Sequence, residues 1–205
     1  MTKQIKALLP SRHPGGRTTL IFTDGSTRKL LPRVVAEHGL APGRQLDDAA
    51  LAALEADNGA ASARQRAVRM IAASSVSKQE LTQRLKQKGE SPEDADSAVA
   101  WLEELQLLDD AETARQIVAR GVSRGYGVER IKQMLYAKRI PRTYWEEALA
   151  GVPDMSGPLE DFLRRRLGEE PDEKALRSAL QAAIRRGYSW TEVHAALEQI
   201  QKRDS

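Results

Sequence analysis

The sequence predicts a mainly α-helical protein: three tandem three-helix repeats that form an elongated, curved rod, behind a small N-terminal part with a β-hairpin and short helices. Three observations lead to this prediction. Ala, Leu, Glu, Lys, Arg and Gln, which favour helix, are abundant in the 205 residues. Beyond residue 60 the apolar residues follow helical spacing and recur with a period of about 48–50 residues. Helix-capping patterns open several of these segments.

The repeat becomes visible when Ser91, Pro141 and Ser189 are aligned. Apolar residues then follow four, seven, eight and eleven places on: Ala95, Trp145 and Val193; Ala98, Ala148 and Ala196; Val99, Leu149 and Leu197; Leu102, Val152 and Ile200. These offsets form one face of a helix. Upstream, Leu180 and Ile184 lie one place away from the apolar pairs Leu81/Ile131 and Leu85/Leu135 of the first two units, so a one-residue slip is expected in the third unit. We expect the units at 60–106, 107–152 and 155–201, with residues 1–59 as the N-terminal part.

The N-terminal part contains one clear strand signal, at residues 18–31 (TTLIFTDGSTRKLL). A β-branched and aromatic run, an Asp24-Gly25 turn and a second run predict a hairpin with a type I′ turn. Because two strands alone are marginal in water, the hairpin must dock on another element. Two short helices are expected next, over residues 32–39 and 46–56.

Four helix starts share one capping pattern, in which a Ser or Asp is followed three residues later by a carboxylate. They are Ser77 to Glu80, Ser91 to Asp94, Asp109 to Glu112 and Ser189 to Glu192. Asp109 and Asp110 together suggest a metal or acid–base site at first sight. Adjacent residues at a helix start point in different directions, however, and no third ligand follows at motif spacing. The structural role is therefore favoured for this pair.

The turn Gly125-Tyr126-Gly127 could hold a phosphate at the start of the helix predicted for residues 128–137. A tight turn in which Gly127 is the N-cap explains the glycines without a ligand. Tyr126 is either a lid on the core of the repeat or a contact for a partner, and both interpretations stay open.

The remaining composition argues against several classes of protein. There are no cysteines, which excludes disulfides and thiolate metal sites and fits a reducing cytosol. No apolar run has the length of a membrane span, and the N-terminus lacks the apolar region of a signal peptide. His13, His38 and His194 lie in different segments without metal or triad spacing. No nucleotide-binding or nucleophile motif is found, so we expect neither an enzyme nor a cofactor or metal. The three tryptophans fall on or beside the repeating apolar faces, which favours core packing.

The middle of the chain is strongly basic. The net charge is only +3, but Glu129 is the single acidic residue between Glu112 and Glu146. The same interval carries Arg115, Arg120, Arg124, Arg130, Lys132, Lys138, Arg139 and Arg142. Such a block indicates either a solvated face or a surface for a negatively charged partner.

These motifs, taken in order, resemble the RecX family of regulatory proteins. LLDD at 107–110, SRGYGVERI at 123–131 and LYAKRI at 135–140 resemble the second repeat of that family, and RRGYSWTEV at 185–193 resembles the third. The DG hairpin and the HGLAPGRQLDD segment resemble an N-terminal extension of many members. Thr113 departs from the usual aromatic residue, and Arg139 departs from a glycine at a helix end. Because arginine is strained in a left-handed backbone, that end is expected to be built differently.

The resemblance implies a cytoplasmic modulator of RecA, the recombinase that polymerises on single-stranded DNA. Members bind RecA and its filament and inhibit strand exchange, ATP hydrolysis and LexA coprotease activity. We expect a monomer when free, weak direct DNA binding at most, and no membrane association. The expected contacts are Arg115, Arg120, Arg124, Tyr126, Arg130, Lys132, Lys138, Arg139 and Arg142, while Asp109, Asp110, Gly125 and Gly127 form a structural signature. The alternative is a direct DNA-binding protein of helix-turn-helix type.

Overall fold

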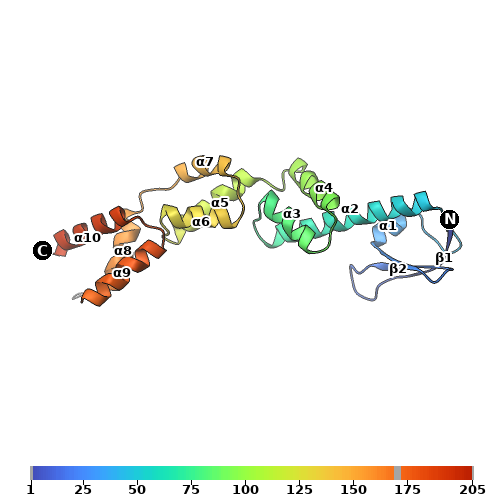
Figure 1. Cartoon of the computed structure of the whole chain (residues 1–205), viewed down its shortest axis with the longest axis horizontal. Helices are drawn as coiled ribbons and strands as arrows, with labels where there is room; N and C mark the ends of the chain where they lie inside the picture. The colour runs from blue at the N-terminus through green and yellow to red at the C-terminus, as the bar shows by residue number, and fades with distance from the viewer. Residues whose placement is uncertain (1, 169–171, 205) are drawn as a thin grey trace. The chain divides into compact units, whose positions relative to one another are not determined.

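The structure is a computed structural model that describes residues 2–168 and 172–204. It is mainly α-helical, as predicted, with a small antiparallel sheet near the N-terminus (Figure 1). The chain divides into two compact units. The first comprises the residues up to 74 together with 81–108, and the second comprises residues 75–80 and those from 109 onward.

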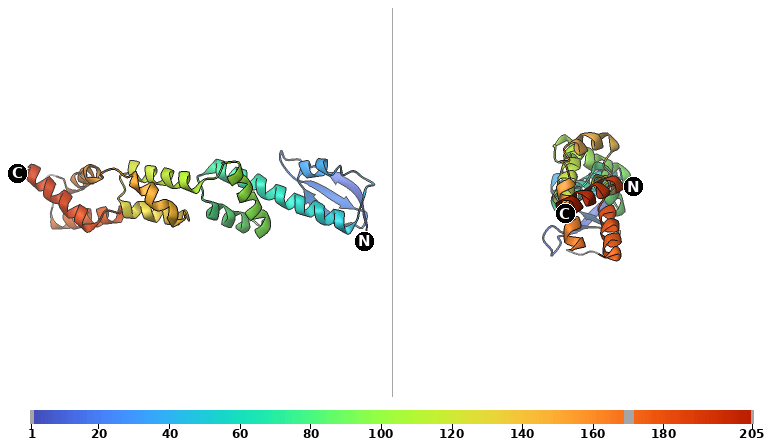
Figure 2. Two further views of the ribbon diagram at one scale, coloured as in Figure 1. Left: turned by 90° about the horizontal axis from the view of Figure 1, so that it is seen from above. Right: turned by 90° about the vertical axis from the view of Figure 1, so that its left-hand side faces the viewer.

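The sheet has four strands in the order β3-β2-β1-β4. They are β1 (Lys3–Leu9), β2 (Thr18–Phe22), β3 (Thr27–Leu30) and β4 (Gln45–Leu46). The predicted hairpin is confirmed as β2 and β3, and β1 and β4 extend it. Ile5, Leu20, Phe22 and Leu30 share a buried core with residues of α1 (Pro32–Glu37) and α2 (Asp48–Ala73). The sheet therefore docks on helix α2, as the left-hand view of Figure 2 shows.

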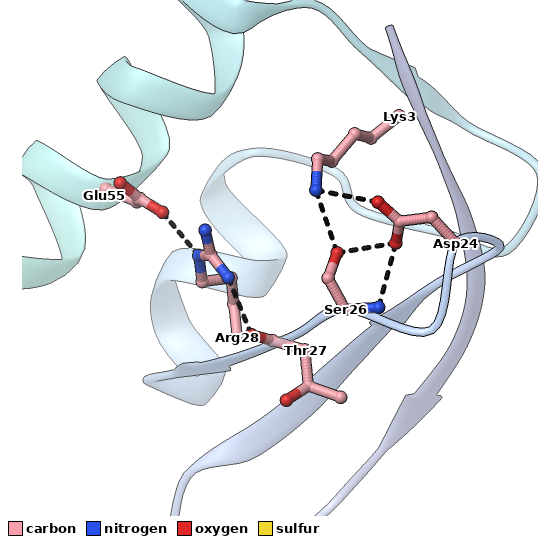
Figure 3. A network of polar contacts seen from close by, with 6 residues as sticks. All are labelled: Lys3, Asp24, Ser26, Thr27, Arg28 and Glu55. Atoms are coloured by element: carbon pink, nitrogen blue, oxygen red, sulfur yellow. Dashed lines mark hydrogen bonds and ion pairs between the residues drawn. The ribbon is translucent and has the colours of Figure 1, made fainter.

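The hairpin turn differs from the type I′ prediction, which requires a positive φ at both Asp24 and Gly25. Only Gly25 has one, with φ of 83°. Phe22 accepts a hydrogen bond from Gly25 N and donates to Ser26 O, the pattern of a three-residue loop ending in a left-handed glycine. The Asp24 carboxylate instead accepts hydrogen bonds from Lys3 Nζ (2.8 Å) and from Ser26 N (2.9 Å) (Figure 3). These bonds, that from Lys3 foremost, hold the pKa of Asp24 well below its usual value.

Helix α2 is longer than the helix predicted for residues 46–56. It spans 26 residues, and the Asp47 side chain accepts a hydrogen bond from Ala50 N (2.7 Å) at its start. Gly59 lies within it, close to α4 (Pro92–Glu104): a Cβ there would lie 2.4 Å from Asp94 Oδ2. The sheet region and the first three-helix unit thus share one continuous helix, which α3 (Lys78–Gln87) and α4 follow.

The last three-helix unit contains α8 (Ser156–Leu167), α9 (Glu173–Arg185) and α10 (Trp190–Asp204). The predicted one-residue slip is wrong. Ala179 and Ala183 occupy the expected core positions and are buried, whereas Ile184 is 40% exposed. The two alanines keep the register of the first two units. The larger Leu180 and Ile184, one place on, led to the wrong prediction from the sequence. Trp190 is also 59% exposed, which overturns its predicted core role. It lies in the first turn of α10, beside the apolar face, with its ring against that of His194.

The four predicted N-caps are confirmed. The side chains of Ser77, Ser91, Asp109 and Ser189 each accept a hydrogen bond from a backbone N–H in the first turn of the next helix. At Ser189 the box is reciprocal, because Glu192 Oε2 accepts from Ser189 N at 2.6 Å.

The helix end at Arg139 is built as it is at the glycine-ended helices, contrary to expectation. Arg139 adopts the left-handed conformation, with φ of 55°. Arg139 N donates to Tyr136 O (2.9 Å) and Ile140 N donates to Leu135 O (3.1 Å), as the equivalent amides do around Gly89 and Gly187. These bonds satisfy carbonyls that the helix end would otherwise leave without partners, which outweighs the strain of the arginine backbone.

Candidate partner-binding surface

The basic region predicted from the sequence lies on α5 (Asp110–Ser123), α6 (Val128–Ala137), η1 (Arg142–Tyr144) and the segment between them, followed by α7 (Trp145–Ala150). Ile117 and Val118 of α5 pack with Ile131 and Leu135 of α6 in one buried cluster. Gly121 allows the two helices to approach closely, because a Cβ there would lie 2.6 Å from Ile131 Cγ1. This packing fixes which side chains of both helices face solvent.

The two aspartates that open this region both bind backbone amides. Asp109 Oδ1 accepts from Ala111 N (2.8 Å) and caps α5. Asp110 is buried, only 3% exposed, and its Oδ1 accepts from Lys78 N (2.9 Å) in the first turn of α3. Thr113, the departure from the family pattern, is also buried and donates from Oγ1 to Asp109 O (2.7 Å). The pair therefore joins α5 to the start of another helix.

The start of α6 is occupied by the last three-helix unit. Gly127 N donates to Arg186 O (2.9 Å) and Glu129 N donates to Gly187 O (3.2 Å). A Cβ on Gly127 would lie 2.2 Å from Gly187 O, so no side chain fits there. Since these amides already have carbonyl partners, the phosphate-binding interpretation of the glycine turn loses its donors.

Arg186 holds this turn from its other side. Its Nε donates to Gly125 O (3.3 Å), and its Nη2 donates to Arg124 O. The guanidinium carbon lies 5.3 Å from the ring centre of Tyr126 and 4.6 Å from that of Phe162. Tyr126 is half-buried and packs against the core of its repeat, which favours the lid over the partner contact.

Tyr188 contacts the same turn: its hydroxyl donates to Gly125 O at 3.0 Å. A tyrosine hydroxyl is protonated at neutral pH and can donate, and burial raises the pKa of Tyr188 further above its usual value.

Three of the predicted basic contacts have carboxylate partners. Arg115 pairs with Glu112 (3.0 Å) and Glu147 (3.3 Å), Lys132 with Glu129 (2.7 Å), and Lys138 with Glu80 (3.3 Å). Hydrogen bonds from Gln116 and then Arg115 hold the pKa of Glu112 below its usual value. The charge of these three residues is partly balanced within the chain.

The other five arginines have no carboxylate partner in the described part of the chain, and all five are exposed. They are Arg120, Arg124, Arg130, Arg139 and Arg142. Arg120 Nε donates to Gln116 O (3.2 Å), and Arg130 donates to Gln133 Oε1 (3.0 Å). This repeat therefore presents uncompensated positive charge to solvent.

Two of these arginines meet exposed aromatic surface at the end of α6. An open groove of about 470 Å³ is lined by Gln79, Tyr136, Ala137, Arg139, Ile140, Arg142 and Trp145. Tyr136 is 72% exposed, and the Arg142 guanidinium carbon lies 5.1 Å from the ring centre of Trp145. We name this the aromatic–arginine groove. Tyr136 was missed in the sequence, although its place one turn before Arg139 was a usable signal.

The structure distributes the predicted contacts over three places. Arg115 and Arg120 lie on α5; Arg124, Tyr126, Arg130 and Lys132 lie around the α5–α6 turn; Lys138, Arg139 and Arg142 lie at the end of α6 and in η1. In the last group, Arg139 and Arg142 line the same groove.

No group of three or more His, Asp or Glu side chains within residues 2–168 and 172–204 could hold a metal ion. Within the same ranges, no helix is both long enough and apolar enough to cross a membrane.

Comparison with known families gives two domain matches. The family model for the first three-helix domain of RecX matches residues 63–102, and that for the second matches residues 109–149. The first range contains the capping patterns at Ser77 and Ser91, and the second contains the pattern at Asp109.

Curated relatives and solved structures agree with these matches. A regulatory protein RecX of Chromohalobacter salexigens is 33% identical over 67% of this chain and 91% of its own length. One of Cronobacter sakazakii is 33% identical over 50% of this chain and 69% of its own. A crystal structure of a regulatory protein RecX superimposes with a TM-score of 0.65 at 18% identity, covering 96% of this chain and 99% of the other, which shows a shared fold.

Proposed function

Because this chain belongs to the RecX family of regulatory proteins, we propose that it binds the RecA recombinase and the RecA filament on single-stranded DNA. Its main effect is to inhibit strand exchange, ATP hydrolysis and LexA coprotease activity. It acts in the cytoplasm as a monomer, by binding alone and without a catalytic centre or cofactor. The observation that carries the proposal is the set of five exposed arginines without carboxylate partners.

The inhibition is steric. Three-helix units at 60–106, 107–152 and 155–201 offer successive contacts, and several weak contacts on one chain raise its avidity for a filament without any single tight site. A chain bound in this way excludes a second DNA and LexA from the surface that it covers. The unpaired arginines supply electrostatic attraction to a negatively charged filament surface.

The test is a titration of the chain into RecA strand exchange and single-stranded-DNA-dependent ATPase assays, down to substoichiometric amounts. We expect inhibition well below one chain per RecA protomer. A variant with Arg120, Arg124, Arg139 and Arg142 all replaced by alanine should need about tenfold more protein, since exposed charge contacts contribute up to roughly 1 kcal/mol each.

The matched control replaces Arg177, Lys202 and Arg203 of the last unit by alanine and should inhibit like the wild type. Tyr126 is kept in both variants because it packs against the core and Arg186. If equimolar wild-type protein left both RecA assays unchanged, the proposed function would be wrong. If the arginine variant and the control inhibited equally, the arginine surface would not be the contact site, but the proposed function would still stand.

A second candidate function is direct DNA binding, and the aromatic–arginine groove favours it. The exposed tyrosine could stack on a base of single-stranded DNA, and the two arginines could bind the adjacent phosphates. Tight binding to naked single-stranded DNA in the absence of RecA would support this candidate.

A further inference from the structure

A second groove lies in the first compact unit and contains no residue of the basic repeat. It has a volume of about 660 Å³ and is lined by Pro14, Gly15, Leu31, Pro32, Arg33, Arg64, Gln65, Val68, Arg69 and Trp101. The lining residues come from the loop after β1, the start of α1, the middle of α2 and the end of α4. Residues of the sheet region and of the first three-helix unit together build it. We name it the N-terminal groove.

Part of the lining of the N-terminal groove is apolar and exposed to solvent. Val68 lies on α2 and is 39% exposed, whereas Leu54 and Ala67 of the same helix are buried. Trp101, Leu31 and the two prolines add further apolar lining. An exposed aliphatic residue in a concave site is typical of a pocket that receives an apolar side chain.

The charged part of the groove is entirely positive. Arg33, Arg64 and Arg69 line it, and no Asp or Glu does. None of the three pairs with a carboxylate in the described part of the chain, whereas Arg66, on the same helix, binds Glu90 at 2.6 Å. The Nε atom of Arg64 is buried and makes no hydrogen bond there, and its guanidinium carbon lies 5.4 Å from the ring centre of Trp101. The groove thus has the opposite charge to an acidic ligand.

We infer that the N-terminal groove binds an acidic peptide segment of a protein partner, with one bulky apolar side chain seated against Val68 and Trp101. The three arginines bind the carboxylates on either side of that side chain. A nucleic acid fits less well, because Val68 offers no face for stacking and the half-buried Trp101 ring already carries Arg64 on it. The inference rests on the proposed function only for the identity of the partner.

The test measures binding of a fluorescent peptide by anisotropy, with the full chain and without RecA. The probe is a short peptide of aspartate and glutamate with one central phenylalanine. Two further peptides replace the phenylalanine by alanine or the acidic residues by lysine. We expect saturable binding of the probe, binding at least about tenfold weaker for the alanine peptide, and none for the lysine peptide.

Two variants locate the site. The Arg33→Ala/Arg69→Ala double variant and the Val68→Asp variant should each bind the probe about tenfold more weakly. All three positions are exposed, so these changes leave the core intact. Arg177→Ala, an exposed arginine of α9 outside the groove, is the matched control and should bind like the wild type.

Equal binding by both groove variants and the wild type would overturn the inference, and so would displacement of the probe by oligothymidylate. Because the assay contains no RecA, its failure would leave the proposed function standing. Conversely, the N-terminal groove contains none of the residues replaced in the arginine variant of the second repeat. Loss of RecA inhibition in that variant therefore neither supports nor contradicts the inference about the groove.

Discussion

At the scale of single residues, two residues other than glycine adopt the left-handed backbone conformation within the described ranges. They are Gln106, with φ of 56°, and Arg139, with φ of 55°. Both follow a helix, and in both cases the next amide donates back to a carbonyl of the last turn: Leu107 N to Leu102 O, and Ile140 N to Leu135 O. The helix stop requires this conformation, which costs an L-residue about 1–2 kcal/mol.

Arg139→Gly should therefore stabilise the protein. Glycine adopts the left-handed region without strain, and part of that gain is lost to its greater freedom in the unfolded chain. We expect the free energy of unfolding to rise by about 0.5–1 kcal/mol. Urea unfolding followed by circular dichroism measures the change.

Ala137→Gly is the matched control, because it adds a glycine to the same turn inside α6, where the backbone is helical. It should lower the free energy of unfolding by up to about 1 kcal/mol. A loss of stability in both variants would show that the left-handed backbone of Arg139 carries no strain.

At the scale of elements, the end of α9 secures the turn between α5 and α6. The Arg186 side chain binds two carbonyls at the end of α5, and its guanidinium contacts the rings of Tyr126 and Phe162. Arg186→Ala removes charged hydrogen bonds and two cation–π contacts together. We expect a loss of about 2 kcal/mol in the free energy of unfolding.

Arg185→Ala is the control for this variant, since Arg185 is its exposed neighbour in α9. Arg186→Lys should lose nearly as much stability as the alanine variant, because lysine lacks the planar fork that reaches two carbonyls and stacks. Unfolding free energies for the three variants come from the same urea titration. Equal values for Arg186→Ala and Arg185→Ala would refute the role of Arg186.

At this scale, the features that could be predicted from the sequence are those that depend on residues close together in the chain. The caps at Ser77, Ser91, Asp109 and Ser189 depend on residues within one turn, so their spacing identified them. The pairing of β1 and β4 joins residues about forty positions apart, Lys3 with Leu46, and no local pattern marks it. The core register of α9 was misread because alanines fill positions where leucine and isoleucine were expected.

The candidate surface also has one feature that could be predicted from the sequence and others that depend on distant contacts. The excess of arginine in the second repeat was evident from the sequence. Which arginines stay unpaired depends on contacts such as that of Lys138 with Glu80, which lies in another helix far away in sequence. Tyr136, Arg139 and Arg142 line one groove because of how α6 ends. An arginine instead of a glycine at that helix end made the end hard to recognise in the sequence.

At the scale of the whole molecule, 32 basic and 29 acidic side chains nearly balance. Since the net charge is only +3, general attraction to DNA is weak, and any strong attraction must come from local surfaces such as the five unpaired arginines. The weak general attraction supports the proposed recognition of a protein filament over the alternative of direct DNA binding.

Salt dependence distinguishes these two modes of binding. A protein that replaces the counterions of six to ten phosphates loses roughly 10³–10⁵ in affinity between about 50 and 200 mM salt. Contacts with RecA would combine a few exposed charges with apolar surface, so we expect the affinity for the filament to fall by less than about tenfold over the same range. Fluorescence anisotropy with RecA-coated and with naked single-stranded DNA measures both, and the ATPase activity of RecA alone at each salt concentration shows that the filament is intact. If filament binding weakened as steeply as binding to naked DNA, the phosphates would be the main ligand and direct DNA binding would replace RecA binding as the function of this chain.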